Sequence, residues 1–399
     1  MPRMWIVLLI AGLIGLAACQ PREIVLEVTR IVETQKEAPE VTRIVSQTEI
    51  QEATRLVTEE VVVEVEVTKP PLGTESRPVQ LLFSPTVDTA VIDQRGQFLA
   101  QTLAEATGHQ FVITVLEDEQ NVIEMMCTAP VETIGFLSAA AYVLAAEQCA
   151  AQAGSVAVNN DGLTWQSGMI VTRRDSGINN LADLDGKSWA VSDKDNMANF
   201  LYFQALLQEE GIEAGDIVEV TGDSAAMLAV YEEEADFATA EFVPPIMPYE
   251  ERLWEYGEDD PEPGRYLGLP PTRSPIGYVL VNGEPEFGGY RLRDARSRIF
   301  DVVPEIYDRT QIVALSAQIP NDTIAFGRDF PLGLARQVTM TLADFAASED
   351  CKESLCATDF YGWTGLLPAE EQIFTPVGFV QETLDLSADE MLELHADGG

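Results

Sequence analysis

The chain has 399 residues, of which 46% are hydrophobic, so it is long enough to form two compact lobes with hydrophobic cores of their own. Its 66 acidic residues outnumber its 24 basic residues and give a formal net charge of −42. This charge excludes a nucleic-acid-binding protein, which needs a basic surface, and it opposes electrostatic docking on anionic lipid headgroups. We expect most of the acidic side chains to form solvated faces that keep the protein soluble.

The first residues are typical of an export signal that ends in a lipid attachment site. Arg3 supplies a short positive region, residues 4–15 are apolar, and residues 16–19 (LAAC) have the form of a bacterial lipobox. The apolar run of about a dozen residues is shorter than the ~20 residues that a membrane-spanning helix needs. We therefore expect residues 1–18 to be a lipoprotein signal peptide and Cys19 to carry the lipid that holds the protein on the membrane, outside the cytoplasm.

Residues 19–76 differ from the rest of the chain because they contain a valine-rich repeat. The repeat occupies residues 28–32, 41–45 and, in a looser form, 54–57. The apolar residues within each repeat have helical spacing, whereas residues 63–67 alternate as a strand does. We interpret this region as a stalk, and a self-associating coiled segment is the alternative.

Four cysteines remain after Cys19, an even number in a compartment that permits disulfides. Four cysteines allow three connectivities. We favour the bonds Cys127–Cys149 and Cys351–Cys356 because each pair is local in the sequence, and buried free thiols are the alternative.

From residue 77 onward, strand patterns alternate with helix patterns. The expected strands are residues 79–83, 111–115, 133–137, 165–171, 188–192 and 276–281. The expected helices are residues 96–107, 121–126, an alanine-rich segment that ends near residue 148, and 197–211. Such an alternation predicts an α/β fold with mostly parallel sheets and right-handed crossovers.

The segment from residue 165 to about residue 243 contains the predicted strand, N-cap loop and helix on which the rest of the prediction depends. The strand 188–192 leads into residues 193–196 (DKDN), which suit a turn and a helix N-cap. The helix that follows should end at Gly211. In an open α/β sheet, a loop between a strand and a helix presents free backbone N–H groups, so we expect small ligands to bind there.

Residues 166–187 (QSGMIVTRRDSGINNLADLDGK) resemble the phosphate/phosphite/phosphonate substrate-binding proteins of ABC transporters. Further matches are residues 201–207, 227–231, 319–322 and 361–368, and together they span residues 79–377. The resemblance implies a type II periplasmic-binding (Venus-flytrap) fold, in which two α/β lobes surround a ligand cleft. We expect residues 77–171 and 319–399 to form lobe 1 and residues 172–318 to form lobe 2, with a hinge at the two crossings.

The residues that bind the anion in this family are replaced here. The resemblance places Glu119 where the family has a tyrosine and Asn196-Met197-Ala198 where it has Ser-Thr-Ser. Asp223 takes the place of the family's histidine. The chain therefore lacks two hydroxyl groups and gains two carboxylates at a site suited to a dianion, a change that disfavours a phosphonate.

We predict instead a ligand that is cationic or carries an amine. Glu119, Asp223 and Glu241 would supply counter-charges, and Tyr142 or Trp165, which match aromatic positions of the family, would form an aromatic wall. The candidate ligand-binding residues, expected at strand and helix ends, are Ser84, Glu119, Tyr142, Trp165, Asp195, Asn196, Met197, Asp223, Ser224 and Glu241. The alternative is that Asp193, Asp195 and Asp223 are ordinary helix N-caps.

Enzyme functions have little support in the sequence. The chain has two histidines, so few residues could form a histidine-rich zinc site or a histidine-based triad. We expect no catalysis, no metal and no cofactor. The predicted function is a lipid-anchored, monomeric solute-binding protein that delivers a small ligand to an ABC permease. The alternative is a sensor or scaffold lipoprotein of the same fold that signals to a membrane receptor.

Overall fold

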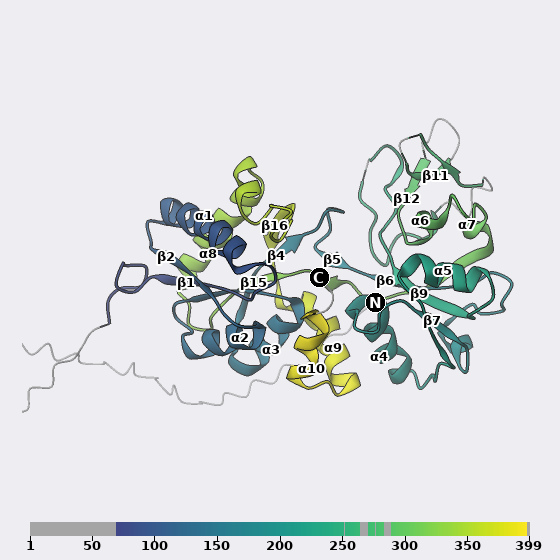
Figure 1. Cartoon of the computed structure of the whole chain (residues 1–399), viewed down its shortest axis with the longest axis horizontal. Helices are drawn as coiled ribbons and strands as arrows, with labels where there is room; N and C mark the ends of the chain where they lie inside the picture. The colour runs from purple at the N-terminus through teal and green to yellow at the C-terminus, as the bar shows by residue number, and fades with distance from the viewer. Residues whose placement is uncertain (1–68, 251, 264–269, 276, 283–288, 397–399) are drawn as a thin grey trace, which may run out of the picture. The chain divides into compact units, whose positions relative to one another are not determined.

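The computed structural model describes residues 69–396 except 251, 264–269, 276 and 283–288 (Figure 1). The predicted signal peptide, the lipidated Cys19 and the stalk up to residue 68 lie outside the described residues. Within the part of the chain that is described, no helix combines the length and the hydrophobicity that crossing a membrane requires.

The first lobe contains a six-stranded sheet. Its strands, in order across the sheet, are β16 (Gly365–Pro368), β4 (Gln152–Val158), β15 (Thr323–Phe326), β3 (Thr133–Leu137), β1 (Val79–Phe83) and β2 (Phe111–Val115). Strands β2, β1, β3 and β4 run in one direction, and β15 and β16 run in the other. The expected mostly parallel sheet is thus interrupted by β15, which enters between β3 and β4 after the chain returns from the second lobe.

Helices cover both faces of this sheet (Figure 1). They are α1 (Thr89–Thr107), α2 (Glu119–Thr128), α3 (Ala139–Cys149), α8 (Leu332–Ala346), α9 (Thr375–Leu384) and α10 (Ala388–Ala396), with short 3-10 turns η5 (Glu349–Glu353) and η6 (Glu371–Phe374). Helices α1 and α8 pack together in one hydrophobic core, and α2, α3, α9 and α10 contribute to the other.

Helix caps explain where the predicted elements begin and end. The strands predicted at 79–83, 111–115 and 133–137 are confirmed as β1, β2 and β3. Helices α1 and α2 begin earlier than predicted because Asp88 and Asp118 accept hydrogen bonds from the first backbone N–H groups. Helix α1 ends where predicted, since Gly108 adopts the left-handed conformation (φ 74°).

The second lobe contains a five-stranded sheet and a small antiparallel sheet. The larger sheet has the order β13 (Thr310–Leu315), β6 (Gly168–Arg173), β9 (Phe237–Glu241), β7 (Trp189–Val191) and β8 (Ile217–Glu219). The small sheet consists of β10 (Thr272–Arg273), β11 (Val279–Asn282) and β12 (Gly289–Leu292). The helical elements of the second lobe are η1 (Leu181–Leu184), η2 (Met197–Leu201), α4 (Tyr202–Glu209), α5 (Asp223–Tyr231), η3 (Pro248–Glu250), α6 (Arg296–Ile299) and α7 (Ile306–Arg309).

The helix predicted from residue 197 is confirmed, with an unexpected first turn. Residues Met197–Leu201 form a π-helical turn that continues into α4. The side chain of Asn196 caps this turn by accepting the N–H groups of Ala198 and Asn199. A Cβ atom at Gly168 would lie 2.4 Å from the carbonyl oxygen of Ala198, so only glycine allows β6 to pass this close to the turn.

The chain passes between the two sheets through a short antiparallel pair, β5 (Trp165–Gln166) with β14 (Ile319–Pro320). The expected strand 165–171 is therefore split, and its main part, β6, pairs with β9 and β13 of the second sheet. We propose that lobe 1 ends at β5 rather than at Val171. The division at residue 319 stays as proposed. The predicted strand 276–281 is observed as β11 over Val279–Asn282, because residues 277 and 278 form the turn that joins it to β10, and residue 276 lies outside the described residues.

Both predicted disulfides are present in the first lobe. Cys127 bonds to Cys149 across 22 residues, and Cys351 bonds to Cys356 across 5 residues. The first bond ties the end of α2 to the end of α3, and the second closes a short loop after α8.

Replacing each cysteine pair by serine should destabilise the first lobe to different degrees. Loss of Cys127–Cys149 should lower the free energy of unfolding by about 3 kcal/mol and loss of Cys351–Cys356 by about 2 kcal/mol, because the longer loop restricts the unfolded chain more. Urea unfolding of the two double variants measures this difference, and each serves as the matched control of the other. A larger loss for the five-residue loop would contradict the expectation.

Candidate functional site

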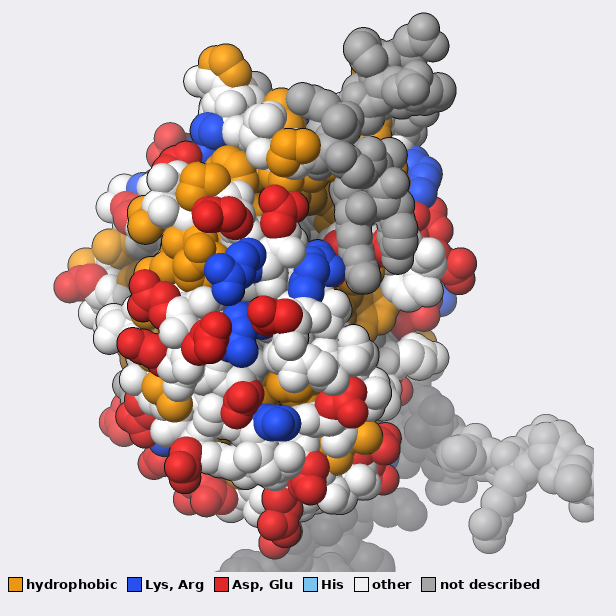
Figure 2. Space-filling model, turned by 90° about the vertical axis from the view of Figure 1, so that its right-hand side faces the viewer, with side chains coloured by type: hydrophobic (Ala, Val, Ile, Leu, Met, Phe, Trp, Pro, Cys, Tyr) orange, Lys and Arg blue, Asp and Glu red, His pale blue; other side chains and the backbone are white. Residues whose placement is uncertain are grey.

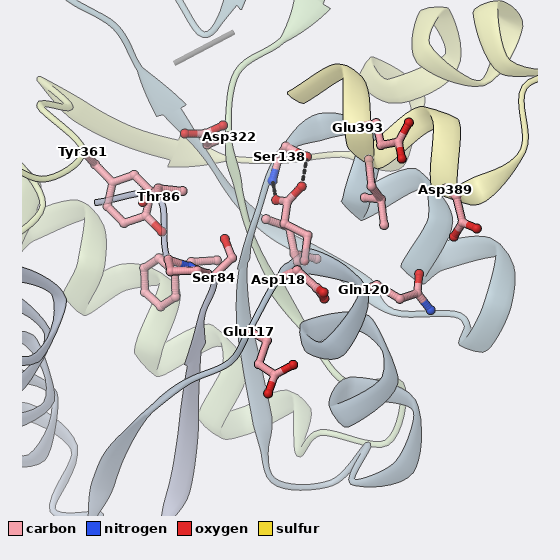
Figure 3. A pocket seen from close by; sticks show the side chains of 15 residues that line it. Ser84, Thr86, Glu117, Asp118, Gln120, Ser138, Asp322, Tyr361, Asp389 and Glu393 are labelled. Carbon is pink, nitrogen blue, oxygen red and sulfur yellow. Dashed lines mark hydrogen bonds between the residues drawn. The ribbon is translucent and has the colours of Figure 1, made fainter. Parts of the chain in front are cut away.

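A pocket of about 500 Å³ opens in the first lobe where β1 and β3 end and α2 begins (Figure 3). Loop residues after the strands, the first turn of α2 and one face of α10 form its walls. The lining residues are Ser84, Pro85, Thr86, Glu117, Asp118, Glu119, Gln120, Phe136, Leu137, Ser138, Asp322, Tyr361, Asp389, Leu392 and Glu393. The pocket thus lies at the carboxyl ends of parallel strands, the usual place for ligands in an open α/β sheet.

Ser138 holds the carboxylate of Glu119 in the lining of this pocket. Its carboxylate accepts the backbone N–H of Ser138 at 2.7 Å and the hydroxyl of Ser138 at 2.8 Å (Figure 3). Ser138 is also the N-cap of α3, where its hydroxyl oxygen accepts the N–H of Ala141 at 3.1 Å. The negative charge of Glu119 therefore lies at the positive end of a helix dipole, which stabilises it.

Carboxylates dominate the charge of this pocket. Six acidic side chains line it, namely Glu117, Asp118, Glu119, Asp322, Asp389 and Glu393, and no Lys or Arg is among the described lining residues. Each additional negative charge in such a site raises the local concentration of cations and disfavours anions.

Aromatic rings and a hydroxyl complete the pocket. Phe136 stacks on Phe83 with ring centroids 4.3 Å apart and lies 6.1 Å from Tyr361. Burial, together with the nearby charges of Asp322 and Glu119, raises the pKa of Tyr361 well above its usual value, so its phenol is neutral. Ser84 is 5% exposed, its hydroxyl has no hydrogen-bond partner among the described residues, and it points toward the pocket (Figure 3).

A second pocket, of about 350 Å³, opens in the second lobe where β7 and β9 end and η2 and α5 begin. Its walls are mostly neutral polar side chains and backbone. The lining residues are Gln166, Ser167, Ser192, Asp193, Asn196, Ala198, Asn199, Gly222, Asp223, Glu241 and Arg298.

The charges of the second pocket are largely satisfied within it. Asp223 accepts the hydroxyl of Ser192 at 2.7 Å and the backbone N–H of Glu241 at 2.8 Å. Glu241 forms an ion pair with Arg298. Figure 2 shows the same mixing on the outer face of this lobe, where basic side chains lie among acidic ones. Across the described residues, no three His, Cys, Asp or Glu side chains are close enough to hold a metal ion.

The structure brings five of the ten predicted site residues to the two pockets. Ser84 and Glu119 line the first pocket, and Asn196, Asp223 and Glu241 line the second. The alternative N-cap role of Asp193, Asp195 and Asp223 is not observed, because Asn196 and Gly222 occupy the N-cap positions.

The other five predicted residues line neither pocket. Tyr142 is 2% exposed in the core, 4.2 Å from the ring of Phe374, and burial, aided by Glu371, raises the pKa of Tyr142 to about 12. Trp165 packs its edge against Tyr256. We therefore remove these two residues from the proposed site, and with them three residues at helix starts, namely Asp195, Met197 and Ser224.

Several pocket residues were missed in the sequence. Ser138 precedes the alanine-rich helix, and the N-cap pattern could have revealed it. Tyr361 lies in a segment that was singled out for its resemblance, but nothing in the sequence assigned it to the pocket. The carboxylates of α10 and Arg298 carry no local signal, because only the packing of distant elements brings them to the pockets.

Two α/β lobes joined by two crossings, each with a pocket at its strand ends, define a two-lobed solute-binding protein. The sequence model of one family matches residues 81–372, and its description is "ABC transporter, phosphonate, periplasmic substrate-binding protein". The chain belongs to this family, so it is a substrate-binding component of an ABC transporter that acts outside the cytoplasm, and not an enzyme. No curated protein matches the chain in sequence.

The chain is also similar to solved structures, at low identity. A Xanthomonas citri protein bound to ATP is 13% identical with a TM-score of 0.43, over 80% of this chain and 99% of that one. A binding protein component of an ABC phosphonate transporter from Pseudomonas aeruginosa is 14% identical (TM-score 0.37; 82% and 94% covered). A Prochlorococcus marinus protein in complex with methylphosphonate is 10% identical (TM-score 0.35; 77% and 98% covered). Because all three scores are below 0.5, the assignment rests on the family match.

The contact between Glu119 and Ser138 should be measurable by a double-mutant cycle. Ser138→Ala and Glu119→Gln should each lower the free energy of unfolding by about 1–2 kcal/mol, because the cap and the charge-assisted bonds are lost. The coupling energy should be about 1 kcal/mol. Glu124→Gln, on the same helix, is the control and should show no coupling with Ser138→Ala. Additive effects of the first pair would show that the bond from the Ser138 hydroxyl to Glu119 contributes nothing.

Proposed function

We propose that this protein binds a cationic, amine-bearing ligand in the first-lobe pocket and delivers it to an ABC permease. The observation that supports this proposal is the set of six carboxylates, without a described basic lining residue, around the pocket. A bound ammonium group would meet several carboxylate acceptors.

A phosphonate would be disfavoured in the same pocket. At about 5 Å and an effective dielectric constant of ~20, each like-charge contact costs roughly 3 kcal/mol. Glu119 worsens this cost, because it occupies the positive end of α3 that would otherwise attract an anion.

The second pocket would complete the site when the lobes close on the ligand. Its neutral donors and acceptors, such as Asn199 and Ser167, suit the uncharged parts of a ligand. Rotation about the β5 and β14 crossings would allow this closure, and the closed form would dock on the permease.

The charge preference can be tested by calorimetry on the full chain. We expect butylamine to bind, with weaker binding at higher salt, and methylphosphonate and inorganic phosphate not to bind. Glu117→Gln should weaken butylamine binding about three- to tenfold, because it removes one carboxylate from the pocket wall. The matched control is Glu382→Gln, which removes an exposed charge of α9. Tight binding of methylphosphonate without binding of butylamine would overturn the proposal.

We also propose that a lipid on Cys19 attaches the protein to the membrane. The lipobox motif of residues 16–19 supports this attachment, and the net charge of −42 leaves little attraction between the protein and anionic headgroups.

Replacing Cys19 by serine should release the protein from the membrane. Fractionation of cells that express the full chain should show the wild type in the membrane fraction and the variant in the soluble extracytoplasmic fraction. A matched Cys351→Ser/Cys356→Ser variant should stay with the membrane. Persistence of the Cys19 variant in the membrane fraction would contradict lipid attachment at this residue.

A further inference from the structure

The C-terminal helix α10 adds a wall to the first-lobe pocket that lies beyond the family match. The match ends at residue 372, whereas α10 spans Ala388–Ala396 and supplies Asp389, Leu392 and Glu393 to the pocket. The family pattern therefore does not account for this side of the pocket.

The face of α10 that points away from the pocket packs against the core of the first lobe, and this contact fixes the position of the helix. Met391 is fully buried and packs in the core that α2 and α3 share, and α10 contacts both of these helices. At the start of the helix, Ser387 and Glu390 cap each other: the hydroxyl of Ser387 donates to Glu390 at 2.6 Å, and the N–H of Glu390 donates to Ser387 at 3.3 Å. With Met391 in the core, Asp389 and Glu393 are presented to the pocket.

Asp389 and Glu393 are two like charges four residues apart on one helix face, a spacing at which they repel each other. A second acidic group, Glu117 and Asp118, comes from the start of α2 (Figure 3). The pocket thus has two separate centres of negative charge on different elements.

Uncharged groups line the pocket together with these two centres. Phe136 and Leu137 are each 2% exposed, and Leu392 adds an apolar side chain from α10. Two polar groups of the lining also have no hydrogen-bond partner among the described residues: the hydroxyl of Ser84, a residue that is 5% exposed, and the buried side-chain oxygen of the half-buried Gln120. An apolar surface with isolated acceptors suits a methylene chain that ends in N–H donors.

We propose that the ligand carries two ammonium groups separated by a methylene chain, as in a linear diamine or polyamine, and that Asp389 and Glu393 are specificity-determining residues for its second charge. The inference rests on the proposed function and deepens it. One ammonium group lies at the α2 side, the chain crosses Phe136 and Leu137, and the second ammonium group lies against α10. Its binding relieves the repulsion between the two α10 carboxylates.

Calorimetry with the full chain tests this inference by comparing butane-1,4-diamine with butylamine, which lacks only the second amine. We expect the wild type to bind the diamine at least about tenfold more tightly. In the double variant Asp389→Asn/Glu393→Gln, this preference should fall to about twofold or less, because the diamine loses more affinity than butylamine when the charges that face its second amine are removed. Glu382→Gln should retain the full preference.

The outcomes separate the two proposals. Equal affinity of the wild type for both amines, or an equal loss of both in the double variant, overturns the diamine inference and leaves the cationic ligand standing. Failure of both amines to bind overturns the cationic ligand and the diamine inference together. Unfolding curves of the double variant, expected to match those of Glu382→Gln, confirm that any loss does not come from a displaced α10.

Discussion

The first lobe depends on a carboxylate bound to a helix N-terminus. Glu119 accepts two hydrogen bonds from Ser138, and Ser138 in turn caps α3. This arrangement joins the start of α2 to the start of α3 at the carboxyl ends of β1 and β3. It also uses a positive helix end, the feature that most often binds anions in such folds, for a side chain of the protein itself.

The two pockets handle charge differently. In the second lobe, acidic groups are matched locally: Asp223 by Ser192 and a backbone N–H, and Glu241 by Arg298. The same lobe buries Arg296 against Asp294 and Glu262. In the first lobe, six carboxylates line one pocket with no described basic lining residue. Ser138 and Asn121 donate hydrogen bonds to Glu119 and Asp118, but no basic side chain among the described lining residues offsets their charge. We therefore propose that the first lobe sets the preference for a positively charged solute.

The family membership and the proposed ligand preference therefore have different origins. The fold, the pair of crossings and the pockets at strand ends follow the family of periplasmic phosphonate-binding proteins. The charge of the first pocket comes from substitutions such as Glu119 and from α10, which lies outside the family match. Fold and ligand class can diverge in this way because a few side chains at a site decide what binds.

The sequence by itself determined the elements whose signals are local. The strands 79–83, 111–115 and 133–137, the end of α1 at Gly108 and the two disulfides were predictable, because apolar alternation, glycine caps and short cysteine separations act within a few residues. Only the tertiary structure decided which residues form the pockets. Tyr142 faces the core and not a ligand, and Asp389 joins Glu117 in one pocket across more than 270 residues, because docking of α10 through Met391 depends on surfaces that no local pattern encodes.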